Sequence, residues 1–137
     1  MPTEFSITHR IQFAETDLAG IVHFSNFFRM MEEVEHAFFR SLGLSVVMRH
    51  EGMEIGWPRV NVSCEYSGSA RFEDELELKM RIARLGEKSM TYEVDFLLTG
   101  KRIASGKVTT VCCVLEEGAM RSIAIPAAIR RKLESSP

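Results

Sequence analysis

The sequence predicts an α+β domain in which a five-stranded antiparallel sheet wraps around one long helix. Two kinds of periodicity carry this prediction. One segment has the 3.6-residue period of an amphipathic helix, whereas the segment before it and four later segments alternate with a period of two. Glycine-containing turns separate several of the alternating segments, which is typical of antiparallel neighbours. A short helix is expected at the C-terminal end.

The first strand and the long helix are expected to be consecutive. Residues 3–13 alternate between apolar and polar side chains, which predicts a half-buried strand. His9 falls on its apolar side, where a histidine is more often a hydrogen-bonded core residue than a catalyst. From Ser25 to Leu42 the period is helical, with Ser25 as the expected N-cap and Gly43 as a left-handed stop. The stripe expected in the core contains Phe27, Met30, Met31, Val34, Ala37, Phe38 and Leu42.

The acidic residues of this helix resemble a run of catalytic acids. We expect Glu32, Glu33 and Glu35 on a solvated helix face instead, because they lie mainly off the apolar stripe. Residues 45–57 show no regular period and are expected to be irregular.

The later strands are expected after Trp57. They are predicted at about residues 59–66, 75–82, 90–98 and 102–115. Gly86 and Gly100 mark the expected hairpin turns. The last strand becomes apolar on both faces from Val108 onward, which suggests that its second face is covered, for example by another subunit. Pro126 is expected to open a helix over residues 127–133.

Length and composition indicate one soluble domain spanning residues 1–137, with 45% apolar and 26% charged residues. A net charge of −2 argues against general nucleic-acid binding. The longest apolar run covers residues 111–115, far short of a membrane span, and the N-terminus lacks a secretory signal pattern. Three cysteines form neither a metal-ligand spacing nor an even disulfide set. We therefore expect a cytoplasmic protein with reduced thiols and no metal.

One stretch, residues 13–28, combines features that suit catalysis. It places Asp17 and Gly20 in a short loop directly before the start of the long helix. A carboxylate at this place can act beside the free backbone N–H groups of a helix start. That combination is suited to attack on a carbonyl, because N–H groups can hold the oxygen as it becomes negative.

The same stretch resembles the hotdog-fold acyl-CoA thioesterases of the 4-hydroxybenzoyl-CoA thioesterase type, including the small Tol-Pal-associated thioesterases. The resemblance covers nearly the whole chain, and its most specific part is the Asp-x-x-Gly-[Ile/Val]-Val segment between first strand and long helix. The residues that carry it are Phe13, Thr16-Asp17, Ala19-Gly20-Ile21-Val22, Asn26-Phe27, Glu32-Glu33, Leu42-Gly43, Asp74-Glu75-Leu76, Arg84 to Ser89 and Ile125-Pro126.

This resemblance implies a set of site residues. Asp17 matches the catalytic carboxylate of the family, and the backbone N–H of Phe24 is by position the expected oxyanion donor. Gly20 would let the chain pass close to the substrate. The sequence has His23-Phe24 where many members have an aromatic residue followed by His or Tyr, so His23 either lines the site or caps the helix. Expected substrate-binding residues are Ile21, Val22, Asn26 and Phe27.

The resemblance also implies an acyl-CoA substrate and a homo-oligomer, with active sites shared across a dimer and dimers that commonly pair into tetramers. A single helix on one face also leaves the edges of the sheet unpaired, which favours association with another chain. A thioester needs no cofactor for hydrolysis, since a base or nucleophile and an oxyanion-stabilising dipole suffice. Asp17 can serve either as nucleophile or as general base. The alternatives are a hotdog dehydratase or hydratase that pairs His23 with Glu32 or Glu33, and a non-catalytic acyl-ligand binding protein.

Overall fold

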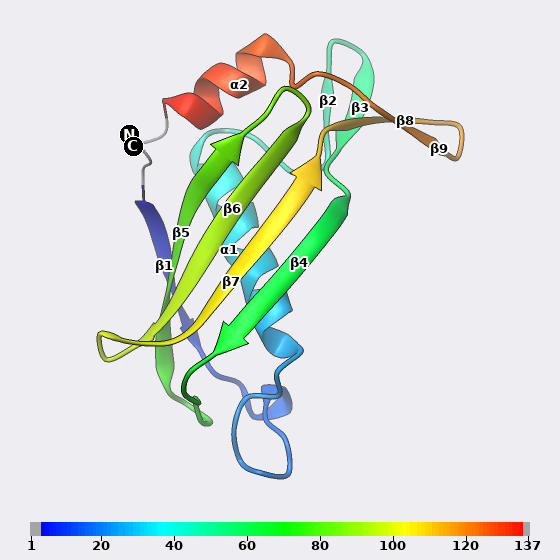
Figure 1. The fold of residues 1–137 in the computed structure, drawn as a ribbon. Coiled ribbons are helices and arrows are strands. Elements are labelled where there is room, and N and C mark those ends of the chain that lie inside the picture. The colour runs from blue at the N-terminus through cyan, green and yellow to red at the C-terminus, as the bar shows by residue number, and fades with distance from the viewer. Residues whose placement is uncertain (1–3, 136–137) are drawn as a thin grey trace.

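The computed structural model, which describes residues 4–135, contains a main antiparallel sheet with helix α1 (Asn26–Ser41) packed across one face (Figure 1). The strand order is β1-β5-β6-β7-β4, so β1 and β4 form the two edges. The predicted α+β class with an antiparallel sheet is confirmed. The strands of this sheet are β1 (Glu4–Arg10), β4 (Arg59–Tyr66), β5 (Glu75–Leu85), β6 (Ser89–Leu98) and β7 (Lys101–Val111).

Helix α1 buries the face that its sequence period indicates. Of the predicted stripe, Ala37 and Leu42 are only half-buried, and the buried members are Phe27, Met30, Met31, Val34 and Phe38. Phe39, which was not predicted in the stripe, is also buried. Gly43 follows the helix with a φ of +76°, the left-handed conformation expected of a stop residue. Ser25 precedes the helix, but its side chain makes no cap hydrogen bond because its Oγ lies 2.8 Å from Nδ1 of His23. The prediction for Glu35 is wrong, since this residue has 0% exposure.

The first strand is shorter than predicted. β1 ends at Arg10, and residues 13–15 form a short 3-10 helix, η1 (Phe13–Glu15). Residue 3 lies outside the described residues. Phe13 continues the alternation of the strand, yet its side chain is 73% exposed because the chain has already turned. Alternation alone does not reveal where a strand leaves its sheet.

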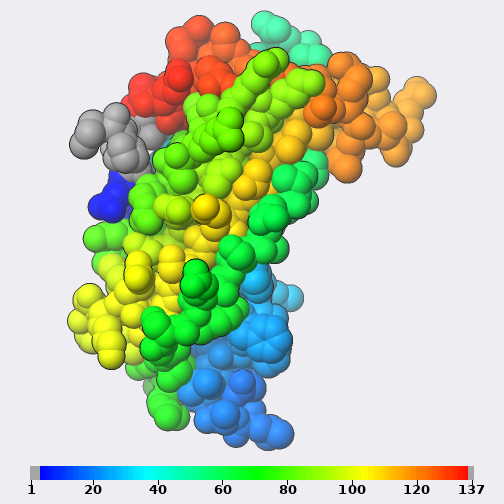
Figure 2. All heavy atoms as spheres, in the orientation of Figure 1, coloured from blue at the N-terminus to red at the C-terminus, as the bar shows by residue number. Residues whose placement is uncertain are grey.

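A second sheet, with the order β2-β3-β8-β9, was missed by the prediction of a single five-stranded sheet. Residues 45–57 are therefore not irregular throughout, because β2 and β3 form a short hairpin within them. The predicted strand 102–115 is broken at Cys112, whose backbone N–H and C=O bond to Lys88 and Ile123 outside the main sheet. The strands are β2 (Met48–His50), β3 (Met53–Gly56), β8 (Cys113–Glu116) and β9 (Ala119–Ser122), the last two forming the projecting hairpin in Figure 2.

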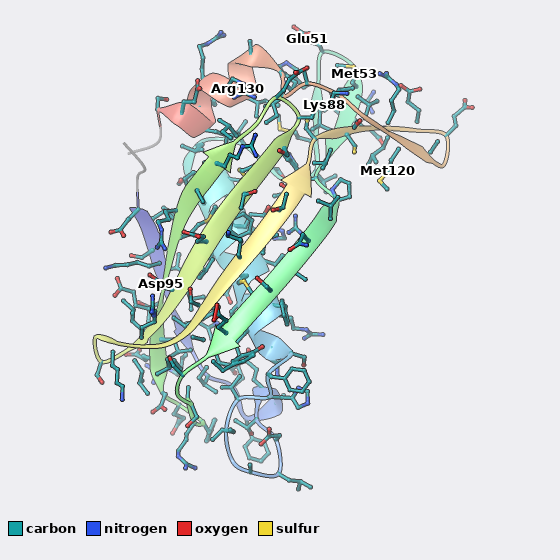
Figure 3. The ribbon with its side chains drawn as sticks, in the orientation of Figure 1. Glu51, Met53, Lys88, Asp95, Met120 and Arg130 are labelled. Atoms are coloured by element: carbon teal, nitrogen blue, oxygen red, sulfur yellow. The ribbon has the colours of Figure 1, made fainter. Side chains whose placement is uncertain are left out.

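The C-terminal segment covers one end of the core. Helix α2 (Ala127–Glu134) begins after Pro126, as predicted, and buries Ile129 and Leu133. Arg130 donates to the carbonyl oxygens of Gly86 and Glu87 and so ties α2 to the β5–β6 turn, where Figure 3 places it near Lys88. After Val108, Cys112 and Val114 are buried within the chain itself, in one core cluster with Ile55, Ile125 and Ile129.

The sheet face away from α1 is charged. Arg81 on β5 lies 3.0 Å from Glu93 and 3.2 Å from Asp95, both on β6 (Figure 3). On the opposite face the helix approaches β7 so closely that a Cβ added to Gly106 would lie 2.2 Å from Sδ of Met31. Among the described residues, no helix is long and apolar enough to cross a membrane.

Candidate active site

The loop of residues 16–22 carries Asp17 between η1 and α1. The loop is narrow, because the N–H of Asp17 donates to the carbonyl of Ile21 at 2.9 Å. Gly20 turns the chain with a φ of +79°, and its N–H donates to the Asp17 carbonyl at 2.9 Å. The Asp17 carboxylate accepts the N–H of Ala19 at 2.9 Å, a local turn that restricts its rotamer. Asp17 is therefore held at a defined place while its side chain stays partly exposed.

The segment that follows leads into the helix and contains Phe24. Its path is fixed by the carbonyl oxygen of Glu15, which accepts the N–H of His23 and the side-chain amide of Asn26, both at 2.8 Å. The carbonyl of Phe24 accepts the hydroxyl of Tyr66 at 2.9 Å. Within residues 4–135, no hydrogen bond engages the backbone N–H of Phe24. This donor lies just before the N-terminus of α1, where the helix dipole favours negative charge.

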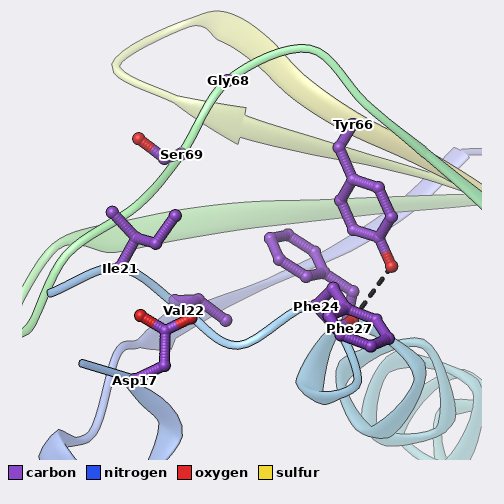
Figure 4. A pocket seen from close by; sticks show the side chains of 8 residues that line it. All are labelled: Asp17, Ile21, Val22, Phe24, Phe27, Tyr66, Gly68 and Ser69. Carbon is purple, nitrogen blue, oxygen red and sulfur yellow. Dashed lines mark hydrogen bonds between the residues drawn. The ribbon is translucent and has the colours of Figure 1, made fainter. Parts of the chain in front are cut away.

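Asp17 and Phe24 line the same cavity, which has a volume of about 180 Å³. Figure 4 shows the two residues on one side of it and the chain at Gly68 and Ser69 on the other. The aromatic wall is rigid, because the Phe27 and Tyr66 rings meet edge to face with centroids 5.2 Å apart. The complete lining is Asp17, Ile21, Val22, Phe24, Phe27, Tyr66, Gly68 and Ser69.

A second, more open hollow of about 570 Å³ lies against the loop, and Asp17 also lines it. Its apolar part is formed by the exposed rings of Phe13 and Phe72, which meet edge to face at 5.6 Å, and by Leu18. Asp17 thus borders two spaces, one narrow and one open.

Comparison with known proteins identifies the family. A model described as the thioesterase-like superfamily matches residues 11–133. The chain belongs to the thioesterase-like superfamily. The family predicted from the loop motif is therefore confirmed.

Three members of this superfamily show how closely the chain is related to others. A protein of Aquifex aeolicus, whose own esterase assignment is provisional, is 34% identical over 120 residues, covering 87% of this chain and 91% of the relative. The 1,4-dihydroxy-2-naphthoyl-CoA hydrolase of Synechococcus sp. strain WH7803 is 29% identical over 137 residues, covering 95% and 88%. The solved structure of a gentisyl-coenzyme A thioesterase has a TM-score of 0.79 at 28% identity, with 92% of this chain and 99% of that chain covered.

The thioesterase-like chain brings together only some of the predicted site residues. Ile21, Val22 and Phe27 line the cavity with Asp17 and Phe24. Gly20 instead lines the open hollow. Asn26 lines neither space. Its side-chain amide donates to the carbonyl of Glu15 and so helps to hold the loop in place.

His23 also lies outside the residues that line either space. Its ring stacks on Phe24 with centroids 4.5 Å apart, and its Nδ1 lies 2.8 Å from Oγ of Ser25. Its predicted pairing with a helix carboxylate is not formed, because Glu33 contacts His9 at 2.8 Å and Glu32 contacts Arg59 at 3.3 Å. The acid–base pair that a dehydratase would need is therefore not assembled.

The sequence analysis did not identify Tyr66 as a site residue. Its hydroxyl bonds to the Phe24 carbonyl, 42 residues away in the chain, so only the tertiary structure brings the two together. Partial burial, together with a hydrogen bond that the Tyr66 hydroxyl donates to the sulfur of Cys64, raises the pKa of Tyr66 to about 12. Its hydroxyl therefore stays protonated, and a donor, throughout the neutral range. The only signal of Tyr66 in the sequence was its position as an aromatic residue at the end of the alternating segment 59–66.

Proposed function

We propose that this protein is an acyl-CoA thioesterase that hydrolyses its substrate with Asp17 as the reacting carboxylate and the Phe24 N–H as oxyanion donor. The observation that supports it most is that Asp17 lines one cavity with Phe24, whose backbone N–H no described residue engages. A base or nucleophile and an oxyanion donor are the two groups that acyl transfer requires. The names of relatives that act on CoA thioesters support the same reaction class.

Two routes are compatible with this arrangement. In the first, a carboxylate oxygen of Asp17 attacks the thioester carbon, the carbonyl oxygen takes the negative charge, and collapse expels the CoA thiolate to leave a mixed anhydride. Water then opens the anhydride to the free acid. In the second, Asp17 removes a proton from a water molecule as that water attacks the thioester carbon; collapse of the oxyanion then breaks the C–S bond and expels the CoA thiolate, which takes up a proton to give the free acid and CoA. In both routes the Phe24 N–H stabilises the developing oxyanion, a contribution of about 2.7–4 kcal/mol in comparable oxyanion holes.

The substrate's acyl part would lie against the apolar cavity wall. The rings of Phe27 and Tyr66 line it, and relatives named for aromatic acyl groups make aromatic CoA thioesters the first candidates. The Phe13 and Phe72 rings of the open hollow offer a second apolar contact for an extended substrate.

The active form would be a homodimer paired along β4. This strand is an edge of the main sheet, and its side chains Val60, Val62 and Tyr66 are 59%, 48% and 43% exposed. An exposed apolar edge strand is a template for pairing with another chain. Because β4 ends at Tyr66, a second copy seated on it would lie beside the cavity.

The test is hydrolysis by purified protein of a panel of aliphatic and aromatic acyl-CoA esters, measured as release of free CoA. We expect turnover of at least one ester, and a loss of about 100-fold or more in kcat for Asp17→Asn and Asp17→Ala. Glu117→Gln is the control, because Glu117 is an exposed carboxylate in the turn between β8 and β9, away from β4, and lines neither the cavity nor the open hollow. Wild-type rates in both Asp17 variants would rule out the mechanism, and no turnover of any ester would rule out the function.

A further inference from the structure

His9 on β1 contacts two carboxylates from two other parts of the chain. Its Nε2 lies 3.0 Å from both carboxylate oxygens of Glu15, the last residue of η1. Its Nδ1 lies 2.8 Å from Oε1 of Glu33 on α1. The His9 and Glu15 side chains are only 14% and 17% exposed, so this contact is partly shielded from water. One imidazole thus connects β1, η1 and α1.

Each ring nitrogen of His9 faces a different carboxylate. Nε2 faces Glu15 and Nδ1 faces Glu33, so one ring bridges two acidic side chains that come from separate elements. A ring N–H donates to the carboxylate that it faces, because an ionised carboxylate only accepts hydrogen bonds. The ring therefore holds Glu15 in place relative to β1 and α1.

Glu15 transmits this contact to the candidate site. Its carboxylate is held by His9 and by the N–H of Gln12 at 2.7 Å, whereas its carbonyl holds the N–H of His23 and the amide of Asn26. Asp17 follows two residues later in the chain. Glu15 therefore lies between the loop that carries Asp17 and the segment that carries the Phe24 N–H, and it fixes one relative to the other.

We propose that His9 is a positioning residue, which through Glu15 sets the placement of the Asp17 carboxylate relative to the Phe24 N–H. The proposal rests on the proposed thioesterase function. His9 itself lines neither the cavity nor the open hollow and does not touch the substrate. Since a misplacement of about 1 Å can cost about 100-fold in rate, losing the contact should lower kcat more than it affects KM.

The test compares His9→Leu and His9→Gln with wild type in the acyl-CoA assay. His9→Leu removes both ring nitrogens and should lower kcat by about 10- to 100-fold, with KM within about threefold. His9→Gln keeps one donating end and should give an intermediate kcat, and it serves alone if His9→Leu does not fold. Glu75→Gln is the matched control, because it removes the exposed ion pair of Glu75 with Arg10 on β1 without touching η1. Its kcat should stay at the wild-type value.

A double variant separates positioning from general damage to the fold. If His9 acts through Asp17, His9→Leu should cause no further loss in an Asp17→Asn background, because its effect and that of Asp17 are not additive. Rates are measured in single turnover with enzyme in excess and corrected for the folded fraction by circular dichroism. An unchanged kcat in His9→Leu and His9→Gln, or an equal loss with and without Asp17, overturns the proposal. Absence of hydrolysis by wild type, or full activity of Asp17→Asn, would instead refute the proposed function.

Discussion

Replacing Arg59 by Met should leave the buried carboxylate of Glu35 without its charged partner. Glu35 has 0% exposure, and both its carboxylate oxygens accept hydrogen bonds from the guanidinium of Arg59. Arg59 also donates to the carbonyl of Trp57 at 3.0 Å and contacts the exposed carboxylate of Glu32. Met fills much of the same space as the aliphatic part of Arg59 but supplies no charge and no donor.

The expected cost follows from these partners. Removing one member of a buried ion pair typically costs about 3–5 kcal/mol of unfolding free energy, because the remaining charge is left without compensation. Burial raises the pKa of Glu35, and the charge and hydrogen bonds of Arg59 oppose this rise, so Arg59→Met should raise the pKa further. A carboxyl with a raised pKa binds its proton more readily in the folded state. Stability therefore falls as pH rises from the ordinary value of 4.5 through the folded-state pKa.

The assay is urea unfolding at pH 5 and pH 7.5 at one fixed protein concentration, followed by circular dichroism and by the fluorescence of Trp57, the only tryptophan. Arg59→Met should lose more stability at the higher pH. The double variant Arg59→Met/Glu35→Leu should have an unfolding free energy only about 1 kcal/mol below that of wild type, the typical value of the lost hydrogen bond from Arg59 to the Trp57 carbonyl. The control Arg49→Met removes an exposed pair with Glu54 and should change stability by less than about 0.5 kcal/mol. An Arg59→Met variant as stable as wild type at pH 7.5 would refute the reasoning.

Two further predictions follow from the helix–sheet contact and from the edge strand. Gly106→Ala should lower the unfolding free energy measured in urea by about 1–3 kcal/mol, because the added Cβ would overlap the buried Met31. An unchanged midpoint of urea unfolding would show instead that the Met31 side chain repacks without cost. Val62→Lys should place a charge at the proposed β4 pairing edge and shift the mass measured by sedimentation from dimer to monomer, with a parallel loss of hydrolysis. A monomeric wild-type protein, or a dimer unaffected by Val62→Lys, would contradict pairing along β4.

Sequence patterns were sufficient for the elements whose signal is local. The period of α1 indicated most of its buried face, and the φ values of +76° at Gly43 and +84° at Gly100 match the expected helix stop and hairpin turn. Loop patterns were less informative, because the β2–β3 hairpin is short and has no clear alternation. The continuous apolar run through Cys112 likewise concealed the point where the chain passes from one sheet to the other.

In the candidate site, too, residues that are contiguous in the chain were predicted and a distant one was missed. The motif around Asp17 and the approach to the helix are contiguous, so Asp17, Phe24, Ile21 and Val22 were predicted from the sequence and line one cavity. Tyr66 was missed because it comes from a strand 42 residues away. The catalytic roles of these residues remain predictions.

What the sequence alone determined was the order and type of the main elements, the family, and the loop that carries Asp17, because periodicity, turn residues and a contiguous motif depend only on near neighbours in the chain. Only the tertiary structure decided how individual polar groups are used. Glu35 is buried beside Arg59, which reaches it across 24 residues of chain, and His9 lies between two carboxylates from separate elements. The cost of burying a polar group depends on which partners folding brings to it, and local sequence does not contain that information.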